Sequence, residues 1–156
     1  MLAAKVMVTD IVTARADETV EVVLDRMRSS KLRMIPVLDA DQVVIGVIST
    51  FSIMEKVVPS YIVTGDLNQI SYAPDIGILR RHYKVIAELH VADVMDVSPL
   101  LVNQDESLLS VAAAMISFTK HEYAMVVDEK KHLLGIVSVG DILDRLKQAA
   151  QGGDDA

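Results

Sequence analysis

Ser138, Gly140 and Asp141 stand together where a buried apolar run gives way to a helical pattern. The Asp141 carboxylate can accept charge-assisted hydrogen bonds from hydroxyl groups of a ligand, and the Ser138 hydroxyl adds a second polar group. The unpaired N–H groups at a helix start favour an anion such as phosphate, and Gly140 lets the backbone approach it closely. These residues favour a site for a small polar ligand. The structural alternative is that Asp141 only caps the helix, which contributes about 1 kcal/mol.

Residues for catalysis or metal binding do not form a known pattern in this sequence. It contains no Gly-x-Ser-x-Gly, no Walker loop and no His-Glu-x-x-His motif. Without cysteine there are no disulfides, thiolate nucleophiles or cysteine-ligated zinc, and no two histidines have metal-ligand spacing. We therefore expect no enzyme, no catalytic cofactor and no metal site.

The composition limits the possible partners. A net charge of −7 over 156 residues argues against nucleic-acid binding, which depends on basic residues. No apolar run reaches the roughly 18 residues of a membrane span, and no signal-peptide pattern opens the chain, so we expect a cytoplasmic protein. The mean hydropathy of +0.36 favours a homodimer that covers apolar helix faces. The alternative is simply a well-filled core.

The chain repeats itself once. Residues 6–54 recur at 94–143, with an offset of 88 that becomes 89 past the first helix. Gly46-Val47-Ile48-Ser49, for example, returns as Gly135-Ile136-Val137-Ser138. Two copies are too few for a solenoid, which needs at least about three. They favour a pseudo-twofold pair with crevices at the seam, and hence a binding module.

Each copy is predicted to fold as strand, helix, strand, strand and helix. Its first helix carries apolar residues at the i, i+3, i+4, i+7 spacing of a helix packed on one face. In the first copy these are Val20, Val23, Leu24 and Met27, and in the second Leu108, Val111, Ala112 and Met115. Asp17 or Thr19 can cap the first of these helices, and Ser107 can cap the second.

The later elements of each copy follow from two apolar runs across a short polar turn, which indicate a hairpin. Pro36 suits an edge or the start of a strand, because it cannot donate a ladder hydrogen bond. The second helix is predicted to open at Ser52 and at Asp141. Ser52 and Glu55 have the spacing of a capping box.

These elements divide the chain into four parts. Repeats are predicted at 1–55 and 93–147. Residues 56–92 form an insert with a helical stretch at 76–89, and residues 148–156 form a disordered tail.

The repeated motifs resemble the CBS-domain pair, or Bateman module. Those of the second copy are Val126-Val127-Asp128 and Gly135-Ile136-Val137-Ser138-Val139-Gly140-Asp141-Ile142. The first copy has Pro36-Val37-Leu38-Asp39 and Gly46-Val47-Ile48-Ser49-Thr50-Phe51-Ser52-Ile53. The resemblance implies an α+β fold of two pseudo-twofold-related repeats packed sheet to sheet. It also implies a stand-alone sensor of AMP, ADP or ATP that acts on an unidentified regulated protein.

The resemblance places a ribose on Asp141, beside Ser138, Val139 and Gly140. It places the base against the first copy, at Met7, Val12, Leu32, Arg33 and Met34. For the apolar residues among these, ordinary core packing is an equal alternative. A second, weaker site would involve Ser49, Ser52, Tyr123 and Met125. It is in doubt because Ser52 replaces the aspartate and Phe51 replaces the glycine.

Cationic side chains that could meet ligand phosphates are Arg33, Lys120 and His121. The insert adds the densest basic cluster, Arg80, Arg81, His82 and Lys84. A solvated helix face is the other interpretation of that cluster. Two rival functions also stay open, namely an S-adenosylmethionine sensor and a protein-interaction scaffold whose ligand site has decayed.

Overall fold

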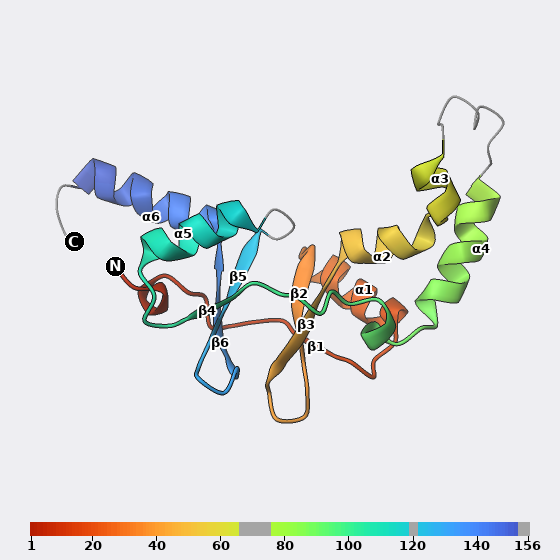
Figure 1. Ribbon diagram of the computed structural model, residues 1–156, viewed down its shortest axis with the longest axis horizontal. Helices are drawn as coiled ribbons and strands as arrows, with labels where there is room; N and C mark the ends of the chain where they lie inside the picture. Colours follow the sequence, from red (N-terminus) through yellow and green to blue (C-terminus); the bar gives the residue numbers. More distant parts are fainter. Residues whose placement is uncertain (66–75, 119–121, 153–156) are drawn as a thin grey trace. The chain divides into compact units, whose positions relative to one another are not determined.

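The structure is a computed structural model that describes residues 1–65, 76–118 and 122–152. The first repeat folds as β1 (Ala14–Arg15), α1 (Val20–Ser29), β2 (Met34–Leu38), β3 (Val44–Ser49) and α2 (Thr50–Val57). The second folds as β4 (Leu101–Asn103), α5 (Leu108–Ser117), β5 (Tyr123–Val127), β6 (Leu133–Ser138) and α6 (Val139–Gly152). The predicted order of strands and helices is therefore confirmed in both copies (Figure 1).

Each repeat builds one three-stranded sheet, in the orders β1-β2-β3 and β4-β5-β6. In the second sheet β4 runs parallel to β5, whereas β5 and β6 form an antiparallel hairpin. The α+β class is confirmed. The insert contributes α3 (Ser60–Thr64) and α4 (Ile76–Ala87), and α4 agrees with the helix predicted at 76–89. Single 3-10 turns precede β1 and β4, at Ala3–Lys5 and Val91–Asp93.

The caps of the first helix in each repeat agree with the sequence. The Thr19 side chain accepts a hydrogen bond from the Val22 N–H at the start of α1, 3.4 Å away. The Ser107 hydroxyl accepts one from the Ser110 N–H at the start of α5, at 3.1 Å. Each side chain satisfies one of the N–H groups that a helix start leaves unpaired.

The prediction for the start of α2 was wrong by three residues. Ser49 is the N-cap, and Ser52 is the third helical residue of a capping box that the two serines form together. Glu55 is not part of it. The N-cap falls at Ser49 because this last strand residue still has an extended backbone, with φ −133° and ψ 161°. Its side chain can therefore turn back to the helix N–H groups.

Pro36 was predicted at an edge or a strand start, and it lies instead within the central strand β2. Its counterpart Met125 donates a backbone hydrogen bond to the Leu100 carbonyl, 2.9 Å away. Proline has no N–H to donate there. The central position is tolerated because the neighbouring β1 is only two residues long, against three in β4.

The predicted tail begins too early. Helix α6 continues through Gly152, so residues 148–152 are helical, and residues 153–156 lie outside the described part. The last turns of α6 contain the good helix formers Lys147, Gln148, Ala149 and Ala150, which explains why the helix persists.

The chain forms two compact units that do not coincide with the sequence repeats. Unit 1 comprises residues 1–12, 38–45 and 98–156, and unit 2 comprises 13–37 and 46–97. In unit 1 the segment before β1, which belongs to the first repeat, pairs with β6 through a bridge between Val8 and Ile136. In unit 2 the segment before β4, which belongs to the second repeat, pairs with β3 through a bridge between Asp96 and Val47. The last strand of each sheet is thus paired with a short segment that comes from the other repeat. Packing of the two sheets against each other stays a prediction.

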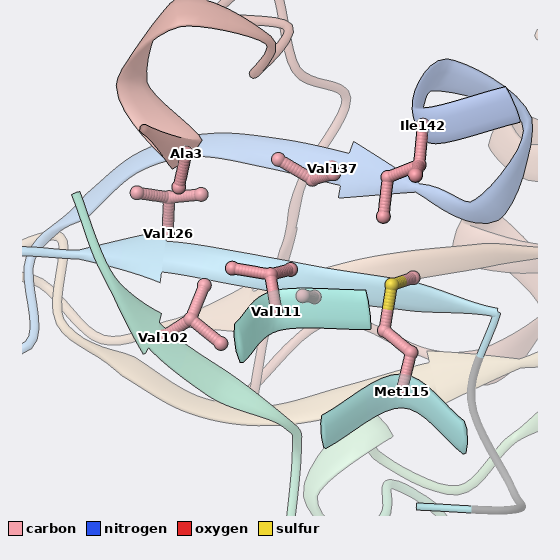
Figure 2. Packing of buried hydrophobic residues seen from close by; sticks show 8 residues of the cluster. Ala3, Val102, Val111, Met115, Val126, Val137 and Ile142 are labelled. Atoms are coloured by element: carbon pink, nitrogen blue, oxygen red, sulfur yellow. The ribbon is translucent and has the colours of Figure 1, made fainter. Parts of the chain in front are cut away.

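The core of unit 1 lies between the sheet and helices α5 and α6. Val111 and Met115 project from α5 toward β5, which carries Val126, and Ile142 of α6 lies near Val137 of β6 (Figure 2). Ala3 extends this core from the N-terminal segment and is fully buried. The core of unit 1 is aliphatic, so helix positions are set by packing of aliphatic side chains rather than by aromatic rings.

Candidate functional site

The start of α6 is held by three hydrogen bonds between Ser138 and Asp141. Asp141 Oδ2 accepts from the Ser138 backbone N–H at 2.8 Å and from the Ser138 hydroxyl at 2.7 Å. In return, the Asp141 N–H donates to Ser138 Oγ at 3.0 Å. Both residues are partly buried. The arrangement is a capping box, so the structural role considered for Asp141 is real, although Asp141 is its inner member rather than the N-cap.

This capping box uses only one oxygen of the carboxylate. Among the described residues, no group donates a hydrogen bond to Asp141 Oδ1. A carboxylate oxygen has about two lone-pair sites, and the two bonds from Ser138 fill those of Oδ2. Oδ1 therefore keeps its full capacity for two hydroxyl donors of a ligand. Capping therefore occupies one carboxylate oxygen of Asp141 and leaves the other available as an acceptor.

The equivalent position in the first repeat behaves differently. The Ser52 hydroxyl accepts from the Ser49 N–H at 3.0 Å and donates to the Ser49 carbonyl at 2.9 Å. Ser52 is only 9% exposed. A serine has a single side-chain oxygen, and here its proton and one lone pair are already used within the helix start. The first repeat thus keeps the cap and lacks the second, unused carboxylate oxygen that Asp141 has.

Gly140 leaves open space above the start of α6. A Cβ atom placed on it would meet only Ser138 Oγ, at an ordinary contact distance of 3.5 Å. The fold therefore does not require glycine at this position. At the equivalent position the first repeat has Phe51, whose side chain is exposed.

Met7 lies in unit 1, in the N-terminal segment that packs against β6, the strand that leads to Ser138. Its side chain covers Gly135 of β6, where a Cβ atom would come within 2.6 Å of the Met7 sulfur. Met7 is partly buried against the core of unit 1, which gives weight to the packing interpretation. Val12 belongs to the same unit and is also partly buried.

The other residues predicted to contact the base belong to unit 2. Leu32 and Met34 are partly buried and Arg33 is exposed. The Arg33 carbonyl accepts a hydrogen bond from the Thr50 N–H at 2.9 Å, which ties this loop to the start of α2. The local structure therefore fixes the backbone of Arg33 beside the first-repeat helix start.

The residues predicted for a second site are also divided between the units. Ser49 and Ser52 belong to unit 2, and Tyr123 and Met125 lie on β5 of unit 1. Tyr123 is partly buried, whereas Met125 is almost fully buried. A ligand could reach the Met125 side chain only with a change in packing.

The predicted phosphate-binding cations do not all fall on described residues. Lys120 and His121 lie outside them. Arg80, Arg81, His82 and Lys84 are all exposed on α4, which packs against α1 and α2 (Figure 1). This exposure agrees with the interpretation of the basic cluster as a solvated helix face.

Sequence analysis did not identify the ion pair between Glu18 and Arg26. The guanidinium Nη1 donates to Glu18 Oε1 at 2.8 Å and to the Thr13 carbonyl at 2.9 Å, and Nη2 also pairs with Glu18. Chiefly through this hydrogen bonding, Arg26 lowers the pKa of Glu18. The sequence spacing does not predict this ion pair, because the two residues are eight positions apart and their side chains meet only when β1 lies beside α1. The pair stabilises the entry to α1.

Two further results concern what the described residues do not contain. No cluster of three or more His, Cys, Asp or Glu among them could hold a metal ion. No helix in the described ranges combines the length and apolar character that a bilayer crossing requires.

The doubled β-α-β-β-α unit defines a tandem-repeat fold, and the comparison with known families identifies it. The CBS domain family profile matches residues 3–59 and 91–148. The chain therefore belongs to the CBS domain family, as the resemblance of its motifs indicated.

The chain is similar to a curated relative, the chloroplastic CBS domain-containing protein CBSX1 of Arabidopsis thaliana, with 24% identity over 152 residues. The match covers 93% of this chain and 63% of that protein, so the chain spans just under two thirds of its relative.

Solved structures share the fold. A CBS domain-containing protein from Bacillus anthracis aligns with a TM-score of 0.75 at 19% identity, covering 95% of this chain and 94% of that one. CBSX2 of Arabidopsis thaliana aligns with a TM-score of 0.74 at 20% identity, covering 97% and 98%. CBSX2 in complex with AMP gives 0.73 at 21% identity, covering 96% and 98%.

Proposed function

We propose that the chain is a ligand-sensing regulatory module that binds an adenine nucleotide, with Asp141 as the ribose-binding residue. The observation that carries this proposal is the unused oxygen of Asp141. Oδ1 can accept the two neighbouring hydroxyls of a ribose while Oδ2 maintains the helix cap. The AMP complex of the similar protein CBSX2 supports the choice of an adenosine ligand.

The remaining ligand contacts are proposed from the residues around this helix start. Ser138, Val139 and Gly140 would border the ribose and any phosphate, and the N–H groups of α6 would favour an anion there. The base would contact Met7 and Val12 of unit 1 and Leu32, Arg33 and Met34 of unit 2. Phosphates would lie toward Arg33, Lys120 and His121, and the α4 cations could assist.

A second site at Ser49, Ser52, Tyr123 and Met125 would be weaker. The Ser52 hydroxyl is already engaged with Ser49, and Ser52 is buried. Removing it from these bonds to bind a ribose would leave polar groups at the α2 start unsatisfied, at a cost of about 1–3 kcal/mol.

Signalling follows from a ligand that contacts both repeats. Such a ligand biases their relative arrangement only to the extent that it binds one arrangement better than another. We infer that an unidentified regulated protein responds to this bias and that the module acts as a homodimer without catalytic activity of its own.

The experiment that tests the proposal is calorimetric titration of the protein with AMP, ADP, ATP and S-adenosylmethionine. We expect saturable binding of at least one adenine nucleotide, weakened strongly by Asp141→Ser. This variant copies Ser52 and can therefore retain the cap. Binding of S-adenosylmethionine alone would favour the first rival function, and no binding by any of the four would favour a scaffold. Equal affinities for wild type and Asp141→Ser would reject the ribose assignment.

A further inference from the structure

Helix α4 differs in charge from the other described helices that carry charged residues. Helices α1 and α6 each contain two acidic and two basic residues, and α2 contains one of each. Helix α4 contains Arg80, Arg81 and Lys84, with His82 between them, and no acidic residue. The whole chain has 22 Asp and Glu against 15 Lys and Arg. The positive charge of α4 is therefore a local reversal in an acidic protein.

The three cations of α4 are close neighbours on the helix. Arg80 and Lys84 have the i, i+4 spacing and Arg81 and Lys84 the i, i+3 spacing, so they lie side by side over about one turn. Like charges at these spacings destabilise a helix. No acidic residue in the described ranges forms an ion pair with any of the three. The cluster thus opposes helix stability, and no described acidic side chain compensates for it.

The apolar side of α4 is already occupied within unit 2. The helix packs against α1 and α2 (Figure 1), which belong to the same unit. Ala87 is buried and Tyr83 and Ile86 are partly buried, whereas the basic side chains are exposed. An amphipathic helix that lies on a membrane needs a free apolar face. What α4 offers a partner is therefore chiefly positive charge.

We propose that the basic face of α4, formed by Arg80, Arg81 and Lys84, is the docking surface for a short segment rich in Asp and Glu on the regulated protein. Charge complementarity selects an acidic partner for this face. Guanidinium groups bind carboxylates through two parallel hydrogen bonds, so the two arginines suit Asp and Glu side chains. The inference rests on the proposed function only in that a regulated protein exists.

The size of the face favours a short segment over an extended polyanion. Helix α4 has 12 residues and is about 18 Å long, a distance that about six extended residues span. A nucleic acid or an anionic bilayer would reach beyond the helix. It would then face the acidic remainder of the chain, beginning with the exposed Glu88 directly after α4 and Glu55 on α2. Charges repel over about 8 Å at physiological salt, so a short segment avoids most of this repulsion.

The test is amide NMR of the isotope-labelled full chain, without nucleotide, titrated with a synthetic peptide of about twelve residues in which Glu alternates with Ser. A peptide with Gln in place of every Glu is the matched probe. Arg81→Glu with Lys84→Glu reverses the charge of the basic face. Lys130→Glu with Lys147→Glu is the control, because it changes the net charge equally at exposed residues of unit 1. Signal dispersion shows that each variant is folded.

We expect the Glu peptide to shift the α4 amide signals of wild type and of the Lys130 and Lys147 variant in a saturable manner. The affinity should fall at least about tenfold in the Arg81 and Lys84 variant, and the Gln peptide should leave the α4 signals in place. Unmoved α4 signals with the Glu peptide, or equal affinities for the two double variants, would overturn the inference.

Two further titrations of wild type separate other uses of these cations. If ATP moves the α4 signals and the Glu peptide does not, the cations serve ligand phosphates and the docking surface is rejected. If phosphatidylserine vesicles sediment the protein through these cations and the Glu peptide does not bind, the face is a membrane contact and the inference is equally overturned. Failure of all nucleotide binding would reject the proposed nucleotide site and leave the peptide result unaffected.

Discussion

Asp141 accepts both hydrogen bonds from Ser138 on the same carboxylate oxygen, Oδ2, and no described residue donates to its other oxygen. The pair therefore stabilises the start of α6 and still presents an acceptor for a ligand. In the first repeat, Ser49 and Ser52 keep the same capping box without the spare oxygen. At this one position the two repeats thus differ by a spare carboxylate oxygen, so capping and ligand binding can be tested separately by mutation.

The first prediction separates capping from binding. Asp141→Ala should lose the ribose hydrogen bonds and part of the helix cap. Asp141→Ser should lose mainly the ribose bonds. Both variants should bind the best adenine nucleotide about ten- to hundred-fold more weakly, because hydrogen bonds to a charged group contribute about 1.5–3 kcal/mol. Unfolding should show that Asp141→Ala loses about 1 kcal/mol of stability and Asp141→Ser less.

Ser52→Ala is the matched control for that experiment. It should leave nucleotide affinity nearly unchanged and lower the free energy of unfolding by about 1–2 kcal/mol, because it removes the Ser52 side-chain hydrogen bonds from the capping box of α2. A large loss of affinity in Ser52→Ala, with Asp141→Ser unaffected, would show that the ligand binds in the other site.

The second prediction concerns Gly135 and Met7. Gly135→Ala should lower the free energy of unfolding by about 1–3 kcal/mol, because its Cβ would lie 2.6 Å from the Met7 sulfur. Combining it with Met7→Ala should recover about 1 kcal/mol of that loss in a double-mutant cycle measured by urea unfolding.

Gly140→Ala serves as the control, because its Cβ meets nothing closer than 3.5 Å. It should be neutral or stabilise by up to about 1 kcal/mol through helix propensity. Additive effects of Gly135→Ala and Met7→Ala would contradict the contact between N-terminal segment and β6.

The third prediction concerns the ion pair of Glu18 and Arg26. Glu18→Gln should lower the free energy of unfolding by about 1–2 kcal/mol near pH 7, allowing for the partial exposure of the pair. The folded-state pKa of Glu18 is below its ordinary value of 4.5, chiefly because of the hydrogen bond from Arg26. Its stabilisation is therefore complete above pH 4.5 and is lost as the pH falls through the folded-state pKa.

Chemical denaturation of wild type and Glu18→Gln between pH 7 and pH 3 measures this effect. The two stabilities should converge at the acid end. Glu106→Gln is the control, since Glu106 stands at the equivalent position but bonds to the Asn103 N–H and the Ser110 hydroxyl, with no arginine. It should cost less, and an equal cost would argue against the role of Arg26.

The fourth prediction concerns the two hairpin turns. Gln42 and Lys131 are counterparts, and both have φ of 66°, a left-handed conformation that side chains disfavour. Gln42→Gly and Lys131→Gly should each raise the free energy of unfolding by up to about 1 kcal/mol. Ala40→Gly, in the same turn at a residue without positive φ, should lower it slightly. Thermal and urea unfolding would reveal the opposite signs.

Local pattern determined much of the fold. Helices α1, α4 and α5 could be predicted because the apolar spacing that identifies a helix involves only residues a few positions apart. The caps at Thr19 and Ser107 were equally local. The repeated motifs indicated the family. The repeat also aligns Asp141 with Ser52 at an offset of 89, so the sequence alone shows that the second copy has a carboxylate where the first has a hydroxyl.

Tertiary structure decided which residues meet across long separations. The bridge between Val8 and Ile136 exchanges a segment between the repeats, and the pairing of Glu18 with Arg26 depends on how β1 lies beside α1. The choice of Ser49 rather than Ser52 as N-cap was set by where β3 ends. The two oxygens of Asp141 are identical in the sequence. Only the folded helix start, which turns Ser138 toward Oδ2, makes one structural and leaves the other for a ligand.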